Sequence, residues 1–190
     1  MDEYELNFNT FMGGWFMPES VIDNILKWSE KNSNKIKSGM VSGGLIKDIK
    51  DSMDISIESN NDDPEIFEYR NYLQECLILY LKKYYDCDLT NDKFNVVEPI
   101  TYQYYRKGGG FKTWHNERGG IKTSKRILVF MTYLNNVENG GTEFKNFNLT
   151  TPAKKGLTLI WPTDWPWIHK GQISHTKEKH IITGWFSFYD

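Results

Sequence analysis

Two segments in the first half of the chain place apolar residues every three or four positions, which is the spacing of an amphipathic helix. The first covers residues 18–32, where Val21, Ile22, Ile25 and Leu26 share one face. The second covers residues 64–85, and its apolar stripe comprises Ile66, Tyr69, Leu73, Cys76, Leu77, Tyr80 and Tyr84. We therefore predict two helices whose apolar faces pack on a common core.

From residue 94 onward the period changes to two, which indicates β-strands with alternating faces. The predicted strands, separated by Gly, Asn and Pro, cover residues 94–106, 111–117, 126–134, 142–147, 157–161, 167–173 and 179–188. In this pattern the Gly140-Gly141 pair is a turn between strands. Seven or eight short strands favour a jelly-roll barrel, the double-stranded β-helix. The predicted class is α+β, with the N-terminal helices packed on the outside of one sheet.

The polar segment between the two predicted helices, residues 35–57, contains three glycines and only a partial alternation. It predicts a mobile loop with a short strand at residues 53–57. A loop of this length is often functional, so we expect a lid that is too polar to join the core, lying near Trp165 and Trp167. The alternative is that the segment is disordered.

A chain of 190 residues is large enough for one good core and predicts one domain over residues 1–190. Residues 1–93 form its helical N-terminal support region, and residues 94–190 form its jelly-roll core.

Three residues carry the most informative chemistry of the chain. His115 and Glu117 are two positions apart, and His169 follows 52 residues after Glu117. In a strand, side chains at i and i+2 point to the same face, so one strand can present two ligands. Two imidazoles and one carboxylate that leave half the coordination sphere free suit a non-haem Fe(II) oxygenase. The pattern also occurs by chance, and His175 and His180 compete for the distal position; His180 is expected to face outward.

The segments around these residues follow in a recognisable order. They are Tyr105 to Glu117 (YRKGGGFKTWHNE), Arg126 to Asn135 (RILVFMTYLN), Gly140 to Phe144 (GGTEF), Pro152 to Pro162 (PAKKGLTLIWP), His169 to Gly171 (HKG) and Lys179 to Trp185 (KHIITGW). This order resembles the 2-oxoglutarate- and Fe(II)-dependent dioxygenases of the prolyl 4-hydroxylase type, over roughly residues 94–190. The resemblance implies Fe(II), 2-oxoglutarate and O2 as cofactors, with ascorbate as a candidate addition.

The resemblance implies that His115, Glu117 and His169 bind the iron. Glu117 stands where the family usually has Asp. The extra methylene leaves open how the carboxylate is oriented toward the metal, but a carboxylate ligand is still expected. Lys179 lies ten residues past His169, where the family places the basic residue that pairs with the far carboxylate of 2-oxoglutarate. Without the resemblance, Lys179 would be interpreted as a solvated surface lysine.

Further residues match positions that surround the co-substrate. By resemblance, Tyr105 and Tyr133 hydrogen-bond 2-oxoglutarate, and Thr183 lies on the strand that follows the basic residue. The alternative for Tyr133 is a core position. Trp185 lies on the same strand, and we expect it in the core.

Four residues flank the predicted ligands and are candidates for substrate contacts: Trp114, Arg118, Trp165 and Trp167. Aromatic grooves suit extended proline-rich peptides. This favours hydroxylation of a prolyl or other peptidyl residue, with release of succinate and CO2; the alternative is that the tryptophans cap the barrel. An oxygenase for a free amino acid or another small molecule stays open. So do a cupin-like metal-binding module without turnover and a barrel that holds zinc or manganese.

Charge and cysteine content limit the remaining classes. The net charge is −2 and no basic stripe is present, so we expect no nucleic-acid partner. Two lysine-rich clusters, residues 35–37 and 122–126, are expected to be solvated surface. Cys76 and Cys87 are too few for a disulfide scaffold and favour a reducing compartment, so we predict a cytoplasmic protein. Neither a signal peptide nor a membrane span is expected, and the oligomeric state is open.

Overall fold

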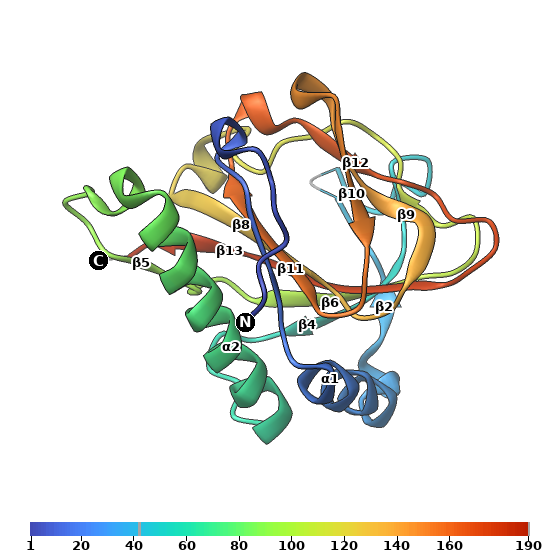
Figure 1. Cartoon of the computed structure of the whole chain (residues 1–190). Helices are drawn as coiled ribbons and strands as arrows, with labels where there is room; N and C mark the ends of the chain where they lie inside the picture. Colours follow the sequence, from blue (N-terminus) through green and yellow to red (C-terminus); the bar gives the residue numbers. More distant parts are fainter. Residues whose placement is uncertain (42, 190) are drawn as a thin grey trace.

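Two helices lie along one side of a layered β structure in the computed structural model, which describes residues 1–41 and 43–189 (Figure 1). They are α1 (Glu19–Lys31) and α2 (Pro64–Lys83). Pro64 suits the first turn of α2 because its ring sets a helical φ and it lacks the N–H that would remain unbonded there. Short 3-10 helices are η1 (Phe8–Thr10), η2 (Ser33–Lys35), η3 (Tyr85–Asp88), η4 (Ile121–Thr123), η5 (Lys145–Phe147) and η6 (Trp165–Trp167).

The main sheet has eight antiparallel strands. In spatial order they are β1 (Gly13–Phe16), β11 (Leu157–Pro162), β8 (Arg126–Tyr133), β13 (Lys179–Phe188), β6 (Ile100–Tyr105), β4 (Met53–Ile57) and β2 (Lys37–Ser38), with β5 (Phe94–Asn95) paired to the end of β13. A second sheet comprises β10 (Leu149–Ala153), β9 (Val137–Phe144) and β12 (His169–Gly171). A third pair joins β3 (Lys50–Asp51) to β7 (Gly110–Phe111).

This arrangement confirms the predicted α+β class and the double-stranded β-helix with helices on one sheet. The second sheet packs across the main sheet (Figure 1). In the described part of the chain the two sheets are separate, so the fold is a two-sheet jelly roll rather than a closed barrel.

The main sheet separates two apolar cores, and β8 shows how one strand serves both. Its Leu128 and Phe130 pack with the helices, whereas Val129, Met131 and Tyr133 pack between the sheets. Alternate side chains of a strand point to opposite faces, so a nearly continuous apolar run is what a strand buried on both sides requires. The core between the sheets is where the candidate site lies.

Both predicted helices and the strand at residues 53–57 are confirmed, the helices within two residues at each end. The expectation that residues 35–57 are too polar to join the core is wrong, because Ile55 and Ile57 are buried against the helices. The mobility of this segment stays a prediction.

Several predicted strands and one predicted turn differ from the structure. Residues 111–117 form a strand only at Gly110–Phe111, and the rest is an irregular segment. The Gly140-Gly141 pair lies inside β9 rather than in a turn. The strand predicted over residues 142–147 begins earlier, at Val137, and ends at Phe144, where η5 follows. The strand β10 was not predicted.

The helical layer buries Cys76, while Cys87 is half-buried, and both thiols are free. The burial of Cys76 agrees with its place in the apolar stripe of the second predicted helix. Neither helix in the described residues is long and apolar enough to cross a bilayer. The single domain over residues 1–190 stays a prediction.

Candidate metal centre and co-substrate pocket

A pair of backbone hydrogen bonds places the two histidines side by side. The N–H of His115 donates to the carbonyl of His169 at 3.0 Å, and the N–H of His169 donates back at 2.9 Å. Two residues later, the N–H of Glu117 donates to the carbonyl of Thr163 at 3.1 Å. The predicted strand over 111–117 was expected to hold His115 and Glu117. In its place, an isolated antiparallel bridge holds His115 and a separate backbone hydrogen bond holds Glu117.

The tautomer of both imidazoles follows from their hydrogen bonds. The Nδ1 atom of His115 lies 2.9 Å from the carbonyl of Thr113, and that of His169 lies 2.8 Å from the carbonyl of Trp167. A carbonyl only accepts, so each Nδ1 donates its proton there, and Nε2 is the ring nitrogen left to bind a metal. The two Nε2 atoms lie 3.4 and 3.5 Å from Oε1 of Glu117. These three atoms can converge on one ion.

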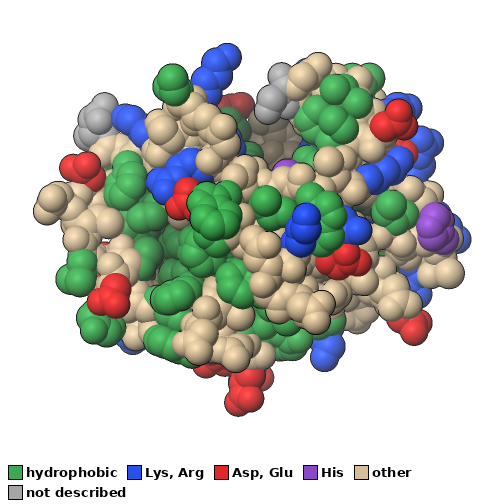
Figure 2. Space-filling view, turned by 90° about the horizontal axis from the view of Figure 1, so that it is seen from above, with side chains coloured by type: hydrophobic (Ala, Val, Ile, Leu, Met, Phe, Trp, Pro, Cys, Tyr) green, Lys and Arg blue, Asp and Glu red, His purple; other side chains and the backbone are tan. Residues whose placement is uncertain are grey.

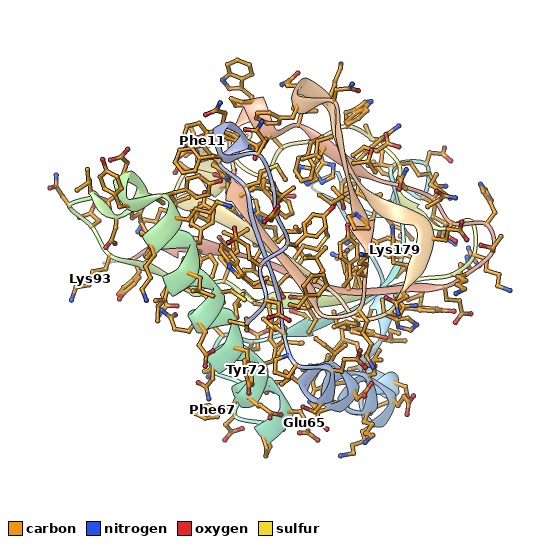
Figure 3. All side chains as sticks on the ribbon, in the orientation of Figure 1. Phe11, Glu65, Phe67, Tyr72, Lys93 and Lys179 are labelled. Carbon is orange, nitrogen blue, oxygen red and sulfur yellow. The ribbon has the colours of Figure 1, made fainter. Side chains whose placement is uncertain are left out.

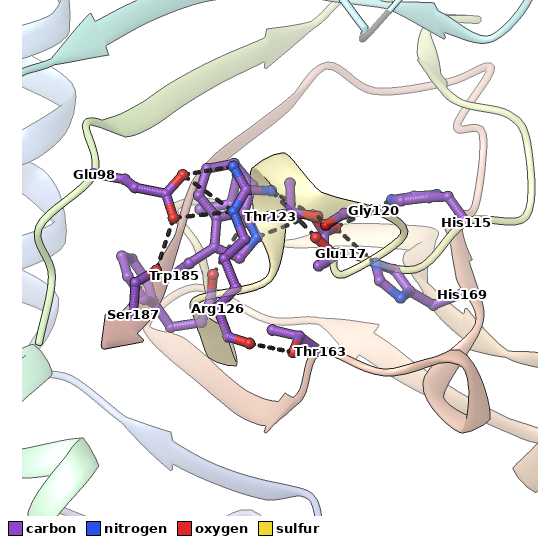
Figure 4. A network of polar contacts seen from close by, with 12 residues as sticks. Glu98, His115, Glu117, Gly120, Thr123, Arg126, Thr163, His169, Trp185 and Ser187 are labelled. Carbon is purple, nitrogen blue, oxygen red and sulfur yellow. Dashed lines mark hydrogen bonds and ion pairs between the residues drawn. The ribbon is translucent and has the colours of Figure 1, made fainter. Parts of the chain in front are cut away.

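The second oxygen of Glu117 is held on the other side. The indole N–H of Trp185 donates to Oε2 at 3.0 Å, and the Arg126 guanidinium lies 3.4 Å from the centre of the Trp185 ring (Figure 4). Arg126 is in turn paired with Glu98 at 2.6 Å, and Glu98 also accepts a hydrogen bond from Ser187 at 2.7 Å. Trp185 packs against the core between the sheets, as the sequence predicted, but its indole N–H faces the site.

The ionisation of Glu117 suits a metal ligand. Burial alone would raise the pKa of this carboxyl, but hydrogen bonds and positive charge from His115 and His169 hold it well below its usual range. The group is therefore a carboxylate at neutral pH. A divalent cation would replace the protons of the histidines as the counter-charge, so the donor set fits an Fe(II) ion.

Lys179 is a buried ammonium that forms no ion pair among the residues described. Its Nζ donates to the carbonyls of Gly140 at 2.9 Å and Gln172 at 2.8 Å, between β13 and β9 (Figure 3). Burial lowers its pKa to about 8. A buried cation without an anion is costly, so a bound carboxylate would complete this environment. This fits the far carboxylate of 2-oxoglutarate.

Three other predicted co-substrate residues line the same cavity as Lys179. The Tyr105 ring lies 5.3 Å from the ammonium, and its hydroxyl donates to Gln103. The Tyr133 hydroxyl lies 2.7 Å from the Thr142 hydroxyl. Thr183 donates to the carbonyl of Phe130 at 3.0 Å. Burial raises the pKa of both tyrosines, so their hydroxyls stay protonated and able to donate.

The competing histidines lie away from the triad. His175 is exposed in the loop before β13. His180 is half-buried on the helix side of the main sheet, with Nδ1 2.7 Å from the Tyr102 hydroxyl. His180 therefore faces away from the interior of the jelly roll, as expected, but the helical layer half-buries it.

The family comparison decides between the remaining classes of metal site. Residues 100–187 match the model of the 2OG-Fe(II) oxygenase superfamily. The chain carries a 2OG-Fe(II) oxygenase domain. Fe(II), 2-oxoglutarate and O2 are its cofactors, as the sequence predicted; ascorbate stays a prediction.

Solved structures share the fold of this oxygenase across nearly the whole chain. A Pseudomonas putida prolyl-4-hydroxylase has a TM-score of 0.71 at 13% identity, covering 95% of this chain and 94% of that one. The viral collagen prolyl hydroxylase of Paramecium Bursaria Chlorella virus-1, solved with 2-oxoglutarate, has 0.69 at 19%, covering 93% and 95%. A Trichoplax adhaerens prolyl hydroxylase in complex with a hypoxia inducible factor peptide has 0.72 at 16%, covering 94% and 84%. A search of curated proteins gives no match.

The four residues predicted to contact the substrate of the oxygenase are absent from the described cavity wall. Arg118 is paired with Asp164, its Nε 2.8 Å from Oδ1. The Trp114 ring lies 4.6 Å from the Lys170 ammonium. Trp165 projects into solvent, and the Trp167 indole donates to the carbonyl of Thr10 at 2.7 Å. That these four residues contact the substrate stays a prediction, and their positions do not favour it. The positions of Trp165 and Trp167 also do not favour the predicted lid near them.

Several residues of the oxygenase site had no recognisable sequence signal. Phe111 stacks on His115 with ring centres 3.7 Å apart, and β3 pairs with the strand that carries it. Lys50 and Asp54, from the segment predicted as a loop, pair at 2.6 Å in the cavity wall. Their roles depend on strand pairing over long sequence distances, which no local pattern encodes.

Proposed function

We propose that this oxygenase hydroxylates a prolyl or other peptidyl residue. In the balanced reaction, a C–H bond of the substrate, O2 and 2-oxoglutarate become a C–OH group, succinate and CO2. Bound iron supplies the redox chemistry that couples the decarboxylation to the hydroxylation. We assign His115, Glu117 and His169 as the iron ligands, and Lys179, Tyr105, Tyr133 and Thr183 as the co-substrate residues.

One observation carries this proposal: three ligand atoms that face one point share a cavity with a buried ammonium that has no carboxylate partner among the described residues. A metal site alone would need only the triad. The additional buried Lys179 calls for an anion at a second position in the same cavity. A small dicarboxylate that reaches both positions satisfies them together.

The described residues divide the work of the site. The backbone carbonyls of Thr113 and Trp167 orient the imidazoles, and Trp185 orients the carboxylate. Buried apolar side chains, Met131, Trp161 and Ile181, form part of the wall beside the co-substrate position and limit the access of water to it.

Two findings support a peptide as the substrate. The cavity has a volume of about 1250 Å³ and opens to the surface, which leaves room beyond a five-carbon acid. One protein of the same fold was solved with a bound peptide. A free amino acid or another small molecule is the alternative outcome of a substrate screen.

The test begins with anaerobic protein, Fe(II) and 2-oxoglutarate, which should give a weak visible band. His169→Ala should abolish the band, and His175→Ala should leave it unchanged because His175 is exposed and remote. On admission of air, the wild-type protein should release succinate without any added substrate. A mass-spectrometric screen of peptides for a gain of 16 Da then identifies the product.

Each result separates one alternative. Loss of the band in His175→Ala with retention in His169→Ala would show that the distal ligand is wrongly assigned. Iron binding without succinate release would favour the binding module without turnover. Gain of 16 Da on free amino acids but not on peptides would contradict the peptidyl substrate.

A further inference from the structure

The mouth of the cavity lies between two segments that are far apart in the sequence. Residues 35–41 contribute one wall, and residues 119–123, which include η4, contribute the other. Figure 2 looks onto the molecule from above and shows a hollow with a histidine side chain inside it. Both segments line the same cavity as His115 and His169, so a substrate in this cavity lies beside them.

The charge of the cavity wall differs from the charge of the chain. Overall the chain has 23 Lys and Arg against 25 Asp and Glu. The wall has two carboxylates, Asp54 and Glu117, and six basic residues, which are Lys35, Lys37, Lys50, Lys122, Arg126 and Lys179. Cations are therefore concentrated at this site.

Three of these cations already have a role inside the cavity. Lys50 is paired with Asp54 at 2.6 Å, and Arg126 is paired with Glu98 at 2.6 Å. We have assigned Lys179 to the co-substrate. The iron, its ligands, 2-oxoglutarate and Lys179 together are close to neutral, so they leave no negative charge to balance the mouth.

The remaining three cations stand at the mouth. Lys35, Lys37 and Lys122 are exposed and form no ion pair with any residue that the structure describes. The sequence-based interpretation of these clusters as solvated surface is accurate for their exposure. It did not foresee that residues 35–37 and 122, which are 85 positions apart, meet around one opening.

Apolar side chains stand among these lysines. Met40 is 69% exposed and Ile121 is 93% exposed, and both line the mouth. Such exposure of large apolar groups at a binding site suits contact with a partner. Nucleic acid is the less suitable partner, because single strands bind on aromatic platforms, and the exposed apolar groups at this mouth are aliphatic.

We propose that the substrate is an acidic peptide whose Asp or Glu side chains flank the hydroxylated residue and bind Lys35, Lys37 and Lys122. This rests on the proposed function and adds the substrate class. The lysines, whose charges no carboxylate of the described residues pairs with, attract the peptide electrostatically, and Met40 and Ile121 contact its apolar side chains. Because the lysines are exposed, the preference weakens as salt is raised.

The test uses three pools of decapeptides with a central proline and flanking positions drawn from Asp and Glu, from Asn and Gln, or from Lys and Arg. Retention of each pool is measured on the protein loaded with Mn(II) and 2-oxoglutarate, and hydroxylation is measured on the Fe(II) enzyme. We expect at least tenfold stronger retention of the acidic pool than of the amide pool. This difference should shrink several-fold between 50 and 500 mM NaCl.

Charge reversal provides the decisive comparison. The triple variant Lys35→Glu, Lys37→Glu, Lys122→Glu should reverse the order of the pools, so that the basic pool is retained best. A matched control, Lys27→Glu, Lys82→Glu, Lys154→Glu, changes the net charge equally at exposed lysines outside the cavity. It should keep the wild-type order and the wild-type release of succinate. Thermal unfolding verifies that both variants are folded.

The outcomes distinguish this inference from the proposed function. Succinate release with equal retention of all pools would overturn the acidic-peptide proposal alone. Absence of metal-dependent succinate release would overturn the proposed function, whereas the retention series would still test the charge preference. Tighter binding of a 20-nucleotide single strand than of the acidic pool, lost in the mouth variant, would replace the peptide with a nucleic acid.

Discussion

Trp185 holds one oxygen of Glu117 while the other oxygen faces the histidines. A glutamate has one more rotatable bond than an aspartate, so its carboxylate can reach a metal with one oxygen or with both. The 3.0 Å hydrogen bond from the indole fixes Oε2, and Oε1 remains directed at the two Nε2 atoms. Stacking of Arg126 and its pairing with Glu98 keep the indole in place. A metal bound by the two histidines would therefore meet Oε1 of Glu117, while Oε2 stays with the indole.

Replacement of Trp185 by Phe should therefore weaken metal binding. The variant keeps an aromatic ring for Arg126 but removes the N–H, and loss of a hydrogen bond to a metal ligand typically costs roughly 10–100-fold in affinity. Release of Oε2 should also shift the visible band of the iron–2-oxoglutarate complex. Trp167→Phe is the control, because that indole donates to Thr10 outside the site. Equal affinities and bands in the two variants would contradict the positioning role.

The ionisation of Lys179 makes co-substrate binding dependent on pH. Burial lowers its pKa to about 8 in the protein without a bound anion. A carboxylate binds the protonated ammonium, so affinity for 2-oxoglutarate should be constant below pH 8. Above pH 8 a proton must be taken up on binding, and affinity should fall by up to about tenfold per pH unit.

Titration of the Mn(II)-loaded protein with 2-oxoglutarate between pH 6.5 and 9.5 measures this dependence. Lys179→Arg keeps a cation at all these pH values and should lose the dependence. Lys179→Ala should bind weakly throughout, with metal affinity retained. A wild-type affinity that is flat to pH 9.5 would show that the ammonium does not contact the co-substrate.

At this scale, residue type and spacing pointed to the candidate triad, and the family resemblance added Lys179. The structure brings all four residues into one cavity. The role of Trp185 was missed. On its strand it alternates like any apolar residue, and only the approach of Glu117, 68 positions away, gives its N–H a partner. A hydrogen-bond partner from a distant strand leaves no local sequence signal.

Strand β9 connects the second sheet to the co-substrate pocket at Gly141. A Cβ atom there would lie 1.7 Å from the carbonyl oxygen of Thr151 in β10. The neighbouring Gly140 carbonyl accepts the hydrogen bond from Lys179. Gly141→Ala should therefore separate β9 from β10, lower stability by about 1–3 kcal/mol or more, and weaken 2-oxoglutarate binding.

Gly120→Ala is the matched control, because the added methyl group would meet no atom within 4 Å beyond its chain neighbours and its backbone is extended. Thermal unfolding and 2-oxoglutarate titration compare the two variants. For a chain of this length, each kcal/mol corresponds to roughly 2–4 °C in Tm. A Gly141→Ala protein as stable as Gly120→Ala would show that the two strands adjust without cost.

Helices and strands with a regular spacing of apolar residues were predicted well. Strands that exist because of the strand they pair with were not. The helices follow their stripes closely. Strand β10 was missed because Thr150, Thr151 and Pro152 lack an apolar alternation, although Thr151 is fully buried. The Gly140-Gly141 pair suggested a turn, yet glycine is needed there because β10 approaches so closely.

At the scale of the whole molecule, the fold class could be predicted because the spacing of apolar residues changes from three or four positions to two near residue 94. The separation into two sheets could not be predicted from that spacing. The segment 35–57 shows why. Its strand β4 extends the main sheet, and its polar start forms part of the cavity mouth. This largely polar segment therefore contributes both to the main sheet and to the cavity mouth. From its composition alone it was predicted to be a loop.

The candidate site also links ligand binding to the stability of the whole chain, because residues from 105 to 185 meet only in the folded state. A ligand at 100 times its Kd adds about 2.7 kcal/mol to the free energy of unfolding, or roughly 5–11 °C in Tm at this chain length. Mn(II) should raise Tm first, and 2-oxoglutarate should add a second increment only when the metal is present. Lys179→Ala should keep the metal increment and lose the second, His169→Ala should lose both, and His175→Ala should keep both. An increment from 2-oxoglutarate in His169→Ala would show that the co-substrate binds without the metal, and the shared-cavity assignment would then fail.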